Sequence, residues 1–153
     1  MEWQYLFETD LGWISLTFRD RAVLRSGFGY QTLDEALRRN RGEWPEVQID
    51  RLPRSTECRY QFASECRRRF ETYARHGGNL LLDIPFVDPS RTVFQSAVVR
   101  ACRAIGAGET ATYGELAAIA GSPGACRAVG NQMARNQLPL LIPCHRVVAT
   151  GKG

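Results

Sequence analysis

The stretch Leu138-Pro139-Leu140-Leu141-Ile142-Pro143-Cys144-His145-Arg146-Val147-Val148 decides how the second half of the chain is interpreted. An apolar run ends at a proline, and a cysteine, a histidine and an arginine follow before apolar sequence resumes. Burial of the apolar residues on both sides would place Cys144 in a pocket rather than on an exposed loop. A thiol reacts as its thiolate, so a neighbouring base or positive charge makes it a nucleophile. His145 and Arg146 could supply both; the competing interpretation is a buried structural cysteine beside a surface histidine.

Upstream of this stretch, the pattern predicts three helices. The first covers residues 92–105 and is capped by Ser90. Two short helices, residues 114–120 and 125–136, follow and are joined by the turn Gly121-Ser122-Pro123-Gly124. Two short helices joined by a Gly/Pro turn are typical of a helix-turn-helix, although such pairs also occur in ordinary helical domains.

The first half of the chain has the pattern of a β-meander followed by helices. β-branched and aromatic residues predict three strands, and Thr32 with Glu35 forms a capping box that opens a short helix. Asp88-Pro89-Ser90 is turn sequence and marks a boundary, so we expect an α/β protein with domains 1–88 and 89–153. The elements predicted before the boundary are strands 3–8, 13–18 and 22–28, a helix to residue 39, a loop over 40–53, a helix over 57–75 and a buried strand at Leu80-Leu81-Leu82.

The charge of the chain is unevenly distributed. Residues 1–90 carry 13 basic and 14 acidic side chains, whereas residues 91–153 carry 7 basic and 2 acidic ones. A basic second half is what a polyanion-binding domain would have, and a chance excess on a solvated surface is the alternative.

Composition places the protein among ordinary globular chains. Of its 153 residues, 44% are hydrophobic and 24% are charged, and no uncharged apolar stretch approaches the roughly 20 residues of a membrane-spanning helix. The start, Met1-Glu2-Trp3-Gln4-Tyr5, lacks the features of a signal peptide. Five cysteines without a CxxC pair, and only two histidines, favour reduced thiols over disulfides or zinc. We therefore expect a soluble cytoplasmic protein with no membrane partner.

The second half resembles the O6-alkylguanine-DNA alkyltransferases (methylated-DNA–protein cysteine methyltransferases). Their Pro-Cys-His-Arg-Val motif stands intact at residues 143–147. The resemblance runs in register from about Thr92 to Val148, and the first 90 residues match only loosely. Its other parts are Thr112-Tyr113-Gly114, Gly121-Ser122-Pro123, Arg127-Ala128-Val129-Gly130 and Asn136.

The resemblance implies direct repair of double-stranded DNA. A guanine carrying an O6-alkyl group is flipped from the duplex, and its alkyl group moves once to Cys144. It also implies a ribonuclease H-like N-terminal part of sheet and helices, a helix-turn-helix part that carries the cysteine, no cofactor and no metal, and a monomer. The implied catalytic residues are Cys144, His145, Tyr113 and Asn136; Pro143 and Val147 line the substrate pocket, and Arg127, Ser122, Gly114 and Thr150 contact DNA. The small residues of the second helix would allow close approach to the minor groove.

The sequence also departs from the family. Gly106 stands where the family usually has a proline, and the chain stops at Gly153, nine residues after Cys144. The family continues through a loop over the alkyl pocket and a helix whose glutamate orients the histidine. We therefore expect reduced stability and weak or absent alkyl transfer from this chain. The alternatives are a lesion-binding or inactive truncated form without transfer, a Cys-His hydrolase and a helix-turn-helix regulator. We expect the other four cysteines to be buried.

Overall fold

The computed structural model describes residues 1–42 and 44–149. The chain divides into two compact units, Met1–Val87 (unit 1) and Asp88–Gly153 (unit 2). This division lies one residue before the boundary predicted from Asp88-Pro89-Ser90.

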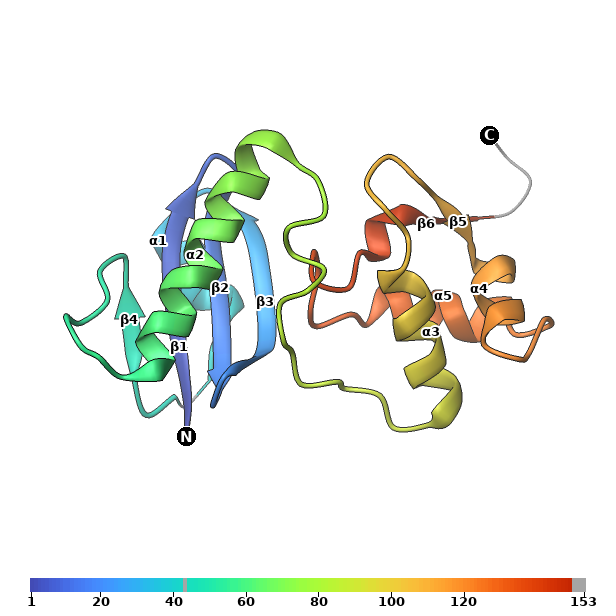
Figure 1. Ribbon diagram of the computed structural model, residues 1–153, viewed down its shortest axis with the longest axis horizontal. Helices are drawn as coiled ribbons and strands as arrows, with labels where there is room; N and C mark the ends of the chain where they lie inside the picture. The colour runs from blue at the N-terminus through green and yellow to red at the C-terminus, as the bar shows by residue number, and fades with distance from the viewer. Residues whose placement is uncertain (43, 150–153) are drawn as a thin grey trace. The chain divides into compact units, whose positions relative to one another are not determined.

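Unit 1 is built on a four-stranded mixed sheet in the order β3-β2-β1-β4 (Figure 1). β1 (Glu2–Thr9), β2 (Gly12–Arg19) and β3 (Ala22–Tyr30) form an antiparallel meander, with Trp3 opposite Phe18 and Phe7 opposite Ile14. The three strands predicted from the β-branched and aromatic residues are therefore confirmed.

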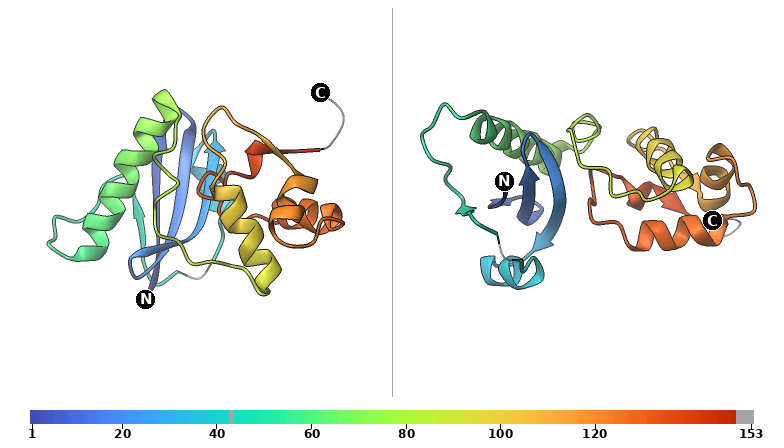
Figure 2. Two further views of the ribbon diagram at one scale, coloured as in Figure 1. Left: turned by 45° about the vertical axis from the view of Figure 1, so that its right-hand side comes forward. Right: turned by 90° about the horizontal axis from the view of Figure 1, so that it is seen from below.

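Two helices cover opposite faces of this sheet, as the right-hand view of Figure 2 shows. α2 (Cys58–His76) packs on the face that carries Trp3, Tyr5 and Phe7, where Trp3 meets Tyr60 edge to face with ring centroids 5.3 Å apart. α1 (Leu33–Arg39) lies on the other face. The hydroxyl of Thr32 accepts a hydrogen bond from the backbone N–H of Glu35, which is the predicted cap of this helix.

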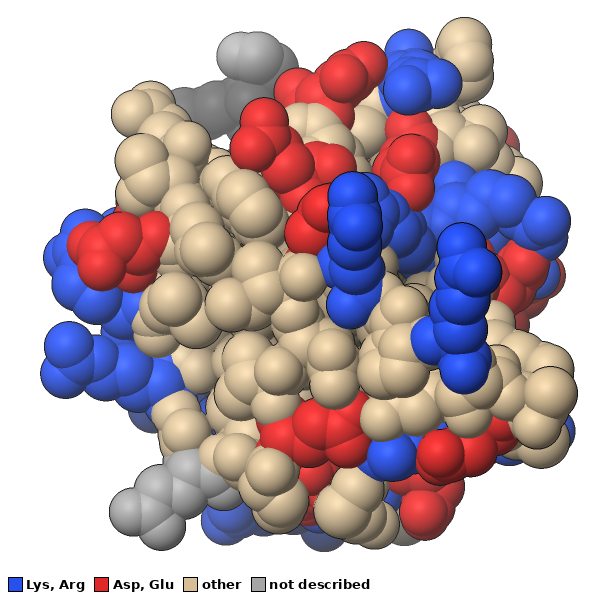
Figure 3. Space-filling view, turned by 90° about the vertical axis from the view of Figure 1, so that its left-hand side faces the viewer, with Lys and Arg blue, Asp and Glu red and all other residues tan. Residues whose placement is uncertain are grey.

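The arginines of α2 are tied to acidic residues around them. Arg59 pairs with Glu46 at 2.7 Å and with Glu57 at 2.8 Å. Arg67 pairs with Asp50 and Glu71. Figure 3 accordingly shows basic and acidic side chains close together on one face of the molecule, without a large area of one sign.

Unit 2 is mostly helical, and its helices bury most of their apolar residues against one another. It contains α3 (Val93–Arg103), α4 (Tyr113–Ile119), α5 (Cys126–Ala134), a 3-10 helix (Cys144–Arg146) and the short parallel pair β5 (Ala111–Thr112) and β6 (Val147–Val148). α4 and α5 form the predicted helix-turn-helix. α4 ends in a Schellman motif: Gly121 has φ 90°, and Ser122 N–H donates to Ala117 O at 2.9 Å.

The structure corrects several predicted elements. The loop predicted over residues 40–53 contains β4 (Val47–Ile49), which pairs with β1. Leu80-Leu81-Leu82 forms turns rather than a strand, although Leu81 is buried. The cap of α3 is Thr92 instead of Ser90, and its hydroxyl accepts from Gln95 N–H. α5 ends at Ala134, so Asn136 lies beyond the helix.

Two negative findings hold for the part of the chain that the structure describes. No helix there is long and apolar enough to cross a membrane. No group of three or more histidine, cysteine, aspartate or glutamate side chains there is arranged to hold a metal ion.

Candidate active site

The segment that leads to Cys144 is folded back on itself by Asn136. The side-chain oxygen of Asn136 accepts from Leu138 N–H at 2.9 Å, and its Nδ2 donates to Ile142 O at 2.9 Å. Leu138 and Ile142 are both buried, so these bonds satisfy backbone groups that water does not reach. Asn136 thereby fixes both ends of the apolar run from Leu138 to Ile142.

Cys144 is the first residue of the 3-10 helix and is half-buried. Its backbone N–H donates to Ile142 O at 2.7 Å, and its carbonyl accepts from Val147 N–H. The backbone on both sides of the thiol is therefore held by short-range hydrogen bonds. The thiol forms no disulfide.

His145 follows Cys144 in the same 3-10 helix and is exposed. Successive side chains of such a helix point about 120° apart, and no hydrogen bond joins His145 to Cys144 in the structure. Partial burial, and then the positive charge of Arg146, lower the pKa of His145 below 6.5. The imidazole is therefore neutral near pH 7 and can accept a proton.

Arg146 is 7% exposed, so its guanidinium lies inside unit 2. Nη1 of Arg146 donates to Ile105 O, just past the end of α3, at 2.7 Å. In the opposite direction, Nε of Arg103 on α3 donates to Leu141 O at 3.0 Å. The end of α3 is thus bonded to the chain before and after Cys144.

The short β5–β6 pair brings Tyr113 toward the motif from another part of the sequence. Thr112 pairs with Val148, and Tyr113 is the next residue, at the start of α4. Its side chain is partly exposed and makes no hydrogen bond to a described residue. Pro143 is buried, as is Val147, which pairs with Ala111.

Three of the four predicted DNA-contacting residues lie on the helix-turn-helix. Arg127 is exposed in the first turn of α5 and forms no ion pair with a described carboxylate. Ser122 is exposed in the turn, and Gly114 is partly exposed in α4. Thr150 lies outside the described residues. The exposed residues of α5 are mainly small or basic: Cys126, Arg127, Ala128, Asn131 and Ala134.

The prediction that the other four cysteines are buried is half right. Cys66 and Cys102 are buried, and burial raises the pKa of each thiol to about 12. Cys58 and Cys126 are exposed. Each of these two begins a helix, where the side chain of the first residue need not face the core.

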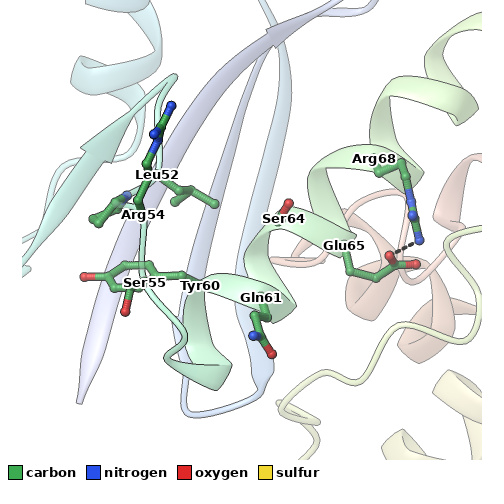
Figure 4. A pocket seen from close by; sticks show the side chains of 9 residues that line it. Leu52, Arg54, Ser55, Tyr60, Gln61, Ser64, Glu65 and Arg68 are labelled. Carbon is green, nitrogen blue, oxygen red and sulfur yellow. Dashed lines mark hydrogen bonds and ion pairs between the residues drawn. The ribbon is translucent and has the colours of Figure 1, made fainter.

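Unit 1 has surface grooves of a different chemical character. Figure 4 shows one of about 470 Å³ between a loop and the first turns of α2. Arg68 in this groove is paired with Glu65. Its lining residues are Leu52, Pro53, Arg54, Ser55, Tyr60, Gln61, Ser64, Glu65 and Arg68. The groove contains neither cysteine nor histidine, so it offers no counterpart to the nucleophile and base of unit 2.

Comparison with known proteins supports the interpretation of unit 2. Residues 93–153 match the family model described as 6-O-methylguanine DNA methyltransferase, DNA binding domain. A methylated-DNA–protein-cysteine methyltransferase of Methanosarcina acetivorans is 42% identical over 93 residues, 60% of this chain and 58% of the relative. One from Haemophilus influenzae is 42% identical over 82 residues, 54% of this chain and 45% of the relative. A crystal structure of the Mycobacterium tuberculosis O6-methylguanine methyltransferase aligns with 100% of this chain and 84% of that one, with a TM-score of 0.69 and 25% identity.

Over residues 93–153, the chain carries the DNA-binding domain of the O6-methylguanine DNA methyltransferase family. It spans about half the length of the curated alkyltransferases it matches. The structural alignment extends over both units, and the α/β fold inferred from the resemblance is confirmed. The loosely matching first 90 residues therefore share the alkyltransferase fold despite their low sequence similarity.

Sequence reasoning missed the two contacts to α3 in this candidate site. In the sequence, Arg103 is one of several charged residues of a predicted helix, and Arg146 is a positive charge next to the Cys144–His145 pair. Nothing in the local pattern indicates that Arg103 bonds to a carbonyl 38 residues away. A guanidinium beside apolar positions was the one available signal, because such a group needs a polar partner when it is buried.

Proposed function

We propose that this protein repairs O6-alkylguanine in duplex DNA by a single transfer of the alkyl group to Cys144. The observation that carries the proposal is the placement of Cys144. It is a half-buried thiol, held by its backbone in a 3-10 helix beside a histidine with a lowered pKa. The methyltransferase names of the relatives support the same reaction.

The reaction needs a thiolate, a proton acceptor and a way to neutralise the leaving guanine. His145 accepts the thiol proton of Cys144 through a bridging water. The sulfur then attacks the alkyl carbon, the S–C bond forms and the O6–C bond breaks. The bonding electrons remain on the guanine, which takes a proton or a hydrogen bond from Tyr113. The proton that His145 took from the thiol then passes through solvent to Tyr113, if it gave up its own, or otherwise to the guanine. The products are S-alkylcysteine and guanine, so each molecule reacts once and needs no cofactor.

DNA binding is assigned to the helix-turn-helix. Its exposed face combines small residues with Arg127, and small side chains permit close approach to the minor groove. Arg127 fills the space that the flipped guanine leaves in the stack and offsets part of the unstacking energy, a few kcal/mol. Ser122, Gly114 and Thr150 contact the backbone of the DNA, and Pro143 and Val147 border the guanine pocket.

The remaining assignments follow from this function. Residues 1–88 form the N-terminal domain, and residues 89–153 form the DNA-binding and active-site domain. The protein acts as a cytoplasmic monomer, because one thiol and one helix-turn-helix suffice for one lesion.

The test compares the protein with its Cys144→Ser variant on a duplex that contains one O6-methylguanine. Loss of the methyl group from the DNA is followed by chromatography of the digested duplex, and binding by fluorescence anisotropy. The proposal expects the variant to bind the duplex with the same affinity and to leave the lesion intact. Equal demethylation by both proteins would refute the assignment to Cys144. Binding without demethylation by either protein would indicate a lesion-binding protein.

A further inference from the structure

The end of α3 and the Cys144 segment hold each other by two reciprocal hydrogen bonds. Arg103, the last residue of α3, donates from Nε to Leu141 O at 3.0 Å. Arg146, in the 3-10 helix, donates from Nη1 to Ile105 O at 2.7 Å. One side chain reaches from the helix to the loop and the other from the loop to the helix. Leu141 and Arg146 lie three residues before and two residues after the thiol, so both flanks of Cys144 are attached to the same helix end.

Stability alone is a weak reason to bury a guanidinium here. Arg146 is 7% exposed, and apolar residues of similar volume often replace buried charged groups without loss of stability. A charged donor does something that an apolar side chain cannot. It fixes the direction and distance of a particular backbone carbonyl. The effect of these two arginines is therefore to fix the positions of the backbone carbonyls that they bond.

We propose that Arg103 and Arg146 are positioning residues that fix Cys144 for attack on the alkyl carbon. The inference rests on the alkyl-transfer function proposed above. Attack at an sp³ carbon requires sulfur, carbon and leaving oxygen in line, and a displacement of about 1 Å can cost about a hundredfold in rate. Neither arginine touches the alkyl group in this account. Each acts through the backbone that carries the thiol.

Arg103 is the better residue for the test, because Arg146 is buried and adjacent to His145. Arg103→Gln removes the charged donor, and Arg103→Lys keeps a charged donor but loses the planar guanidinium. Arg100→Gln is the matched control, since Arg100 is an exposed arginine in the last turn of the same helix. The measurements are single-turnover methyl transfer at increasing duplex concentration, and amide hydrogen exchange over residues 141–147.

We expect Arg103→Gln to lower the maximal transfer rate constant about tenfold while the duplex concentration at half-maximal rate stays unchanged. Exchange over residues 141–147 should become faster, and Arg103→Lys should recover part of both losses. Arg100→Gln should behave like the unaltered protein. A merely structural role would speed the exchange without changing the maximal rate, and that result would overturn the proposal. An unchanged rate and unchanged exchange would overturn it as well.

The design separates this proposal from the proposed function. If the unaltered protein and Arg100→Gln both fail to transfer a methyl group, the alkyl-transfer function is wrong, and with it the role of the arginines in transfer. Hydrogen exchange then still decides whether Arg103 fixes the backbone around Cys144.

Discussion

At the scale of single residues, the site depends on a histidine that stays neutral at pH values at which an ordinary histidine begins to be protonated. Partial burial and the nearby Arg146 disfavour the protonated imidazole of His145. In the proposed reaction, the neutral imidazole is the form that accepts the proton of Cys144. Arg146 therefore lowers the pKa of His145 and also bonds the segment around Cys144 to the end of α3.

The lowered pKa of His145 predicts how transfer depends on pH. The acid limb of the rate profile should have its midpoint below 6.5, the ordinary pKa of histidine. The free energy of unfolding should depend on pH as well. Because the unfolded chain binds this proton more readily than the folded chain, stability falls as the pH drops below 6.5 toward the pKa of the folded state. An NMR titration of the His145 ring, with single-turnover rates at each pH, measures both. A midpoint at or above 6.5 would contradict the account.

Asn136 gives a prediction on stability. Asn136→Ala removes the acceptor of Leu138 N–H and a donor to Ile142 O, both in buried backbone. A buried donor left without a partner costs about 1–3 kcal/mol, and urea unfolding measures this loss. Asn131→Ala, at an exposed position of α5, is the control and should cost much less. Equal costs for the two variants would show that the Asn136 bonds do not stabilise the fold.

At the scale of elements, the sequence predicted what is long or strongly patterned and missed what is short. The meander was predictable because Trp3, Tyr5 and Phe7 alternate with residues of the other face. β4 was missed because its three residues lie at the sheet edge, and its two apolar side chains, Val47 and Ile49, are 41% and 42% exposed. β5 and β6 have two residues each, and only the tertiary fold brings them together.

The turn of the helix-turn-helix gives a prediction of its own. Gly121 has φ 90°, where a side chain is strained, and a Cβ there would meet no atom within 4 Å. Gly121→Ala should therefore destabilise through the backbone alone, by about 1–2 kcal/mol. Gly124 in the same turn has the same open space without the positive φ, so Gly124→Ala should leave the unfolding free energy unchanged or slightly raised. Thermal unfolding of both variants checks this, and equal destabilisation would contradict it.

At the scale of the whole molecule, charge is balanced in one unit and not in the other. The arginines of α2 are paired with carboxylates of unit 1. In unit 2, Arg127 on α5 and Arg135 just after it are exposed and form no ion pair with a described carboxylate. The charge counts of the two halves could be taken from the sequence, but which arginines are neutralised depends on the fold.

This contrast predicts which arginines make the affinity for duplex DNA depend on salt. Arg127→Ala should weaken binding and reduce the slope of log affinity against log salt by about one. Arg54→Ala is the control, because Arg54 is an exposed arginine of unit 1. It should leave the affinity and the slope unchanged. Anisotropy titrations over a range of salt concentrations measure both. Equal effects of the two substitutions would contradict the assignment of DNA binding to the helix-turn-helix.

The proposed repair reaction requires that Cys144 itself receives the alkyl group. The most direct measurement is an intact and peptide mass spectrum of the protein after incubation with excess duplex containing one O6-methylguanine. Because the proposed transfer consumes the protein, even a slow reaction would end at the same stoichiometry. Transfer to Cys144 predicts a gain of one methyl mass, no more than one per molecule, on the peptide that contains Cys144. A methyl group on any other residue, or no gain while the duplex is bound, would contradict it.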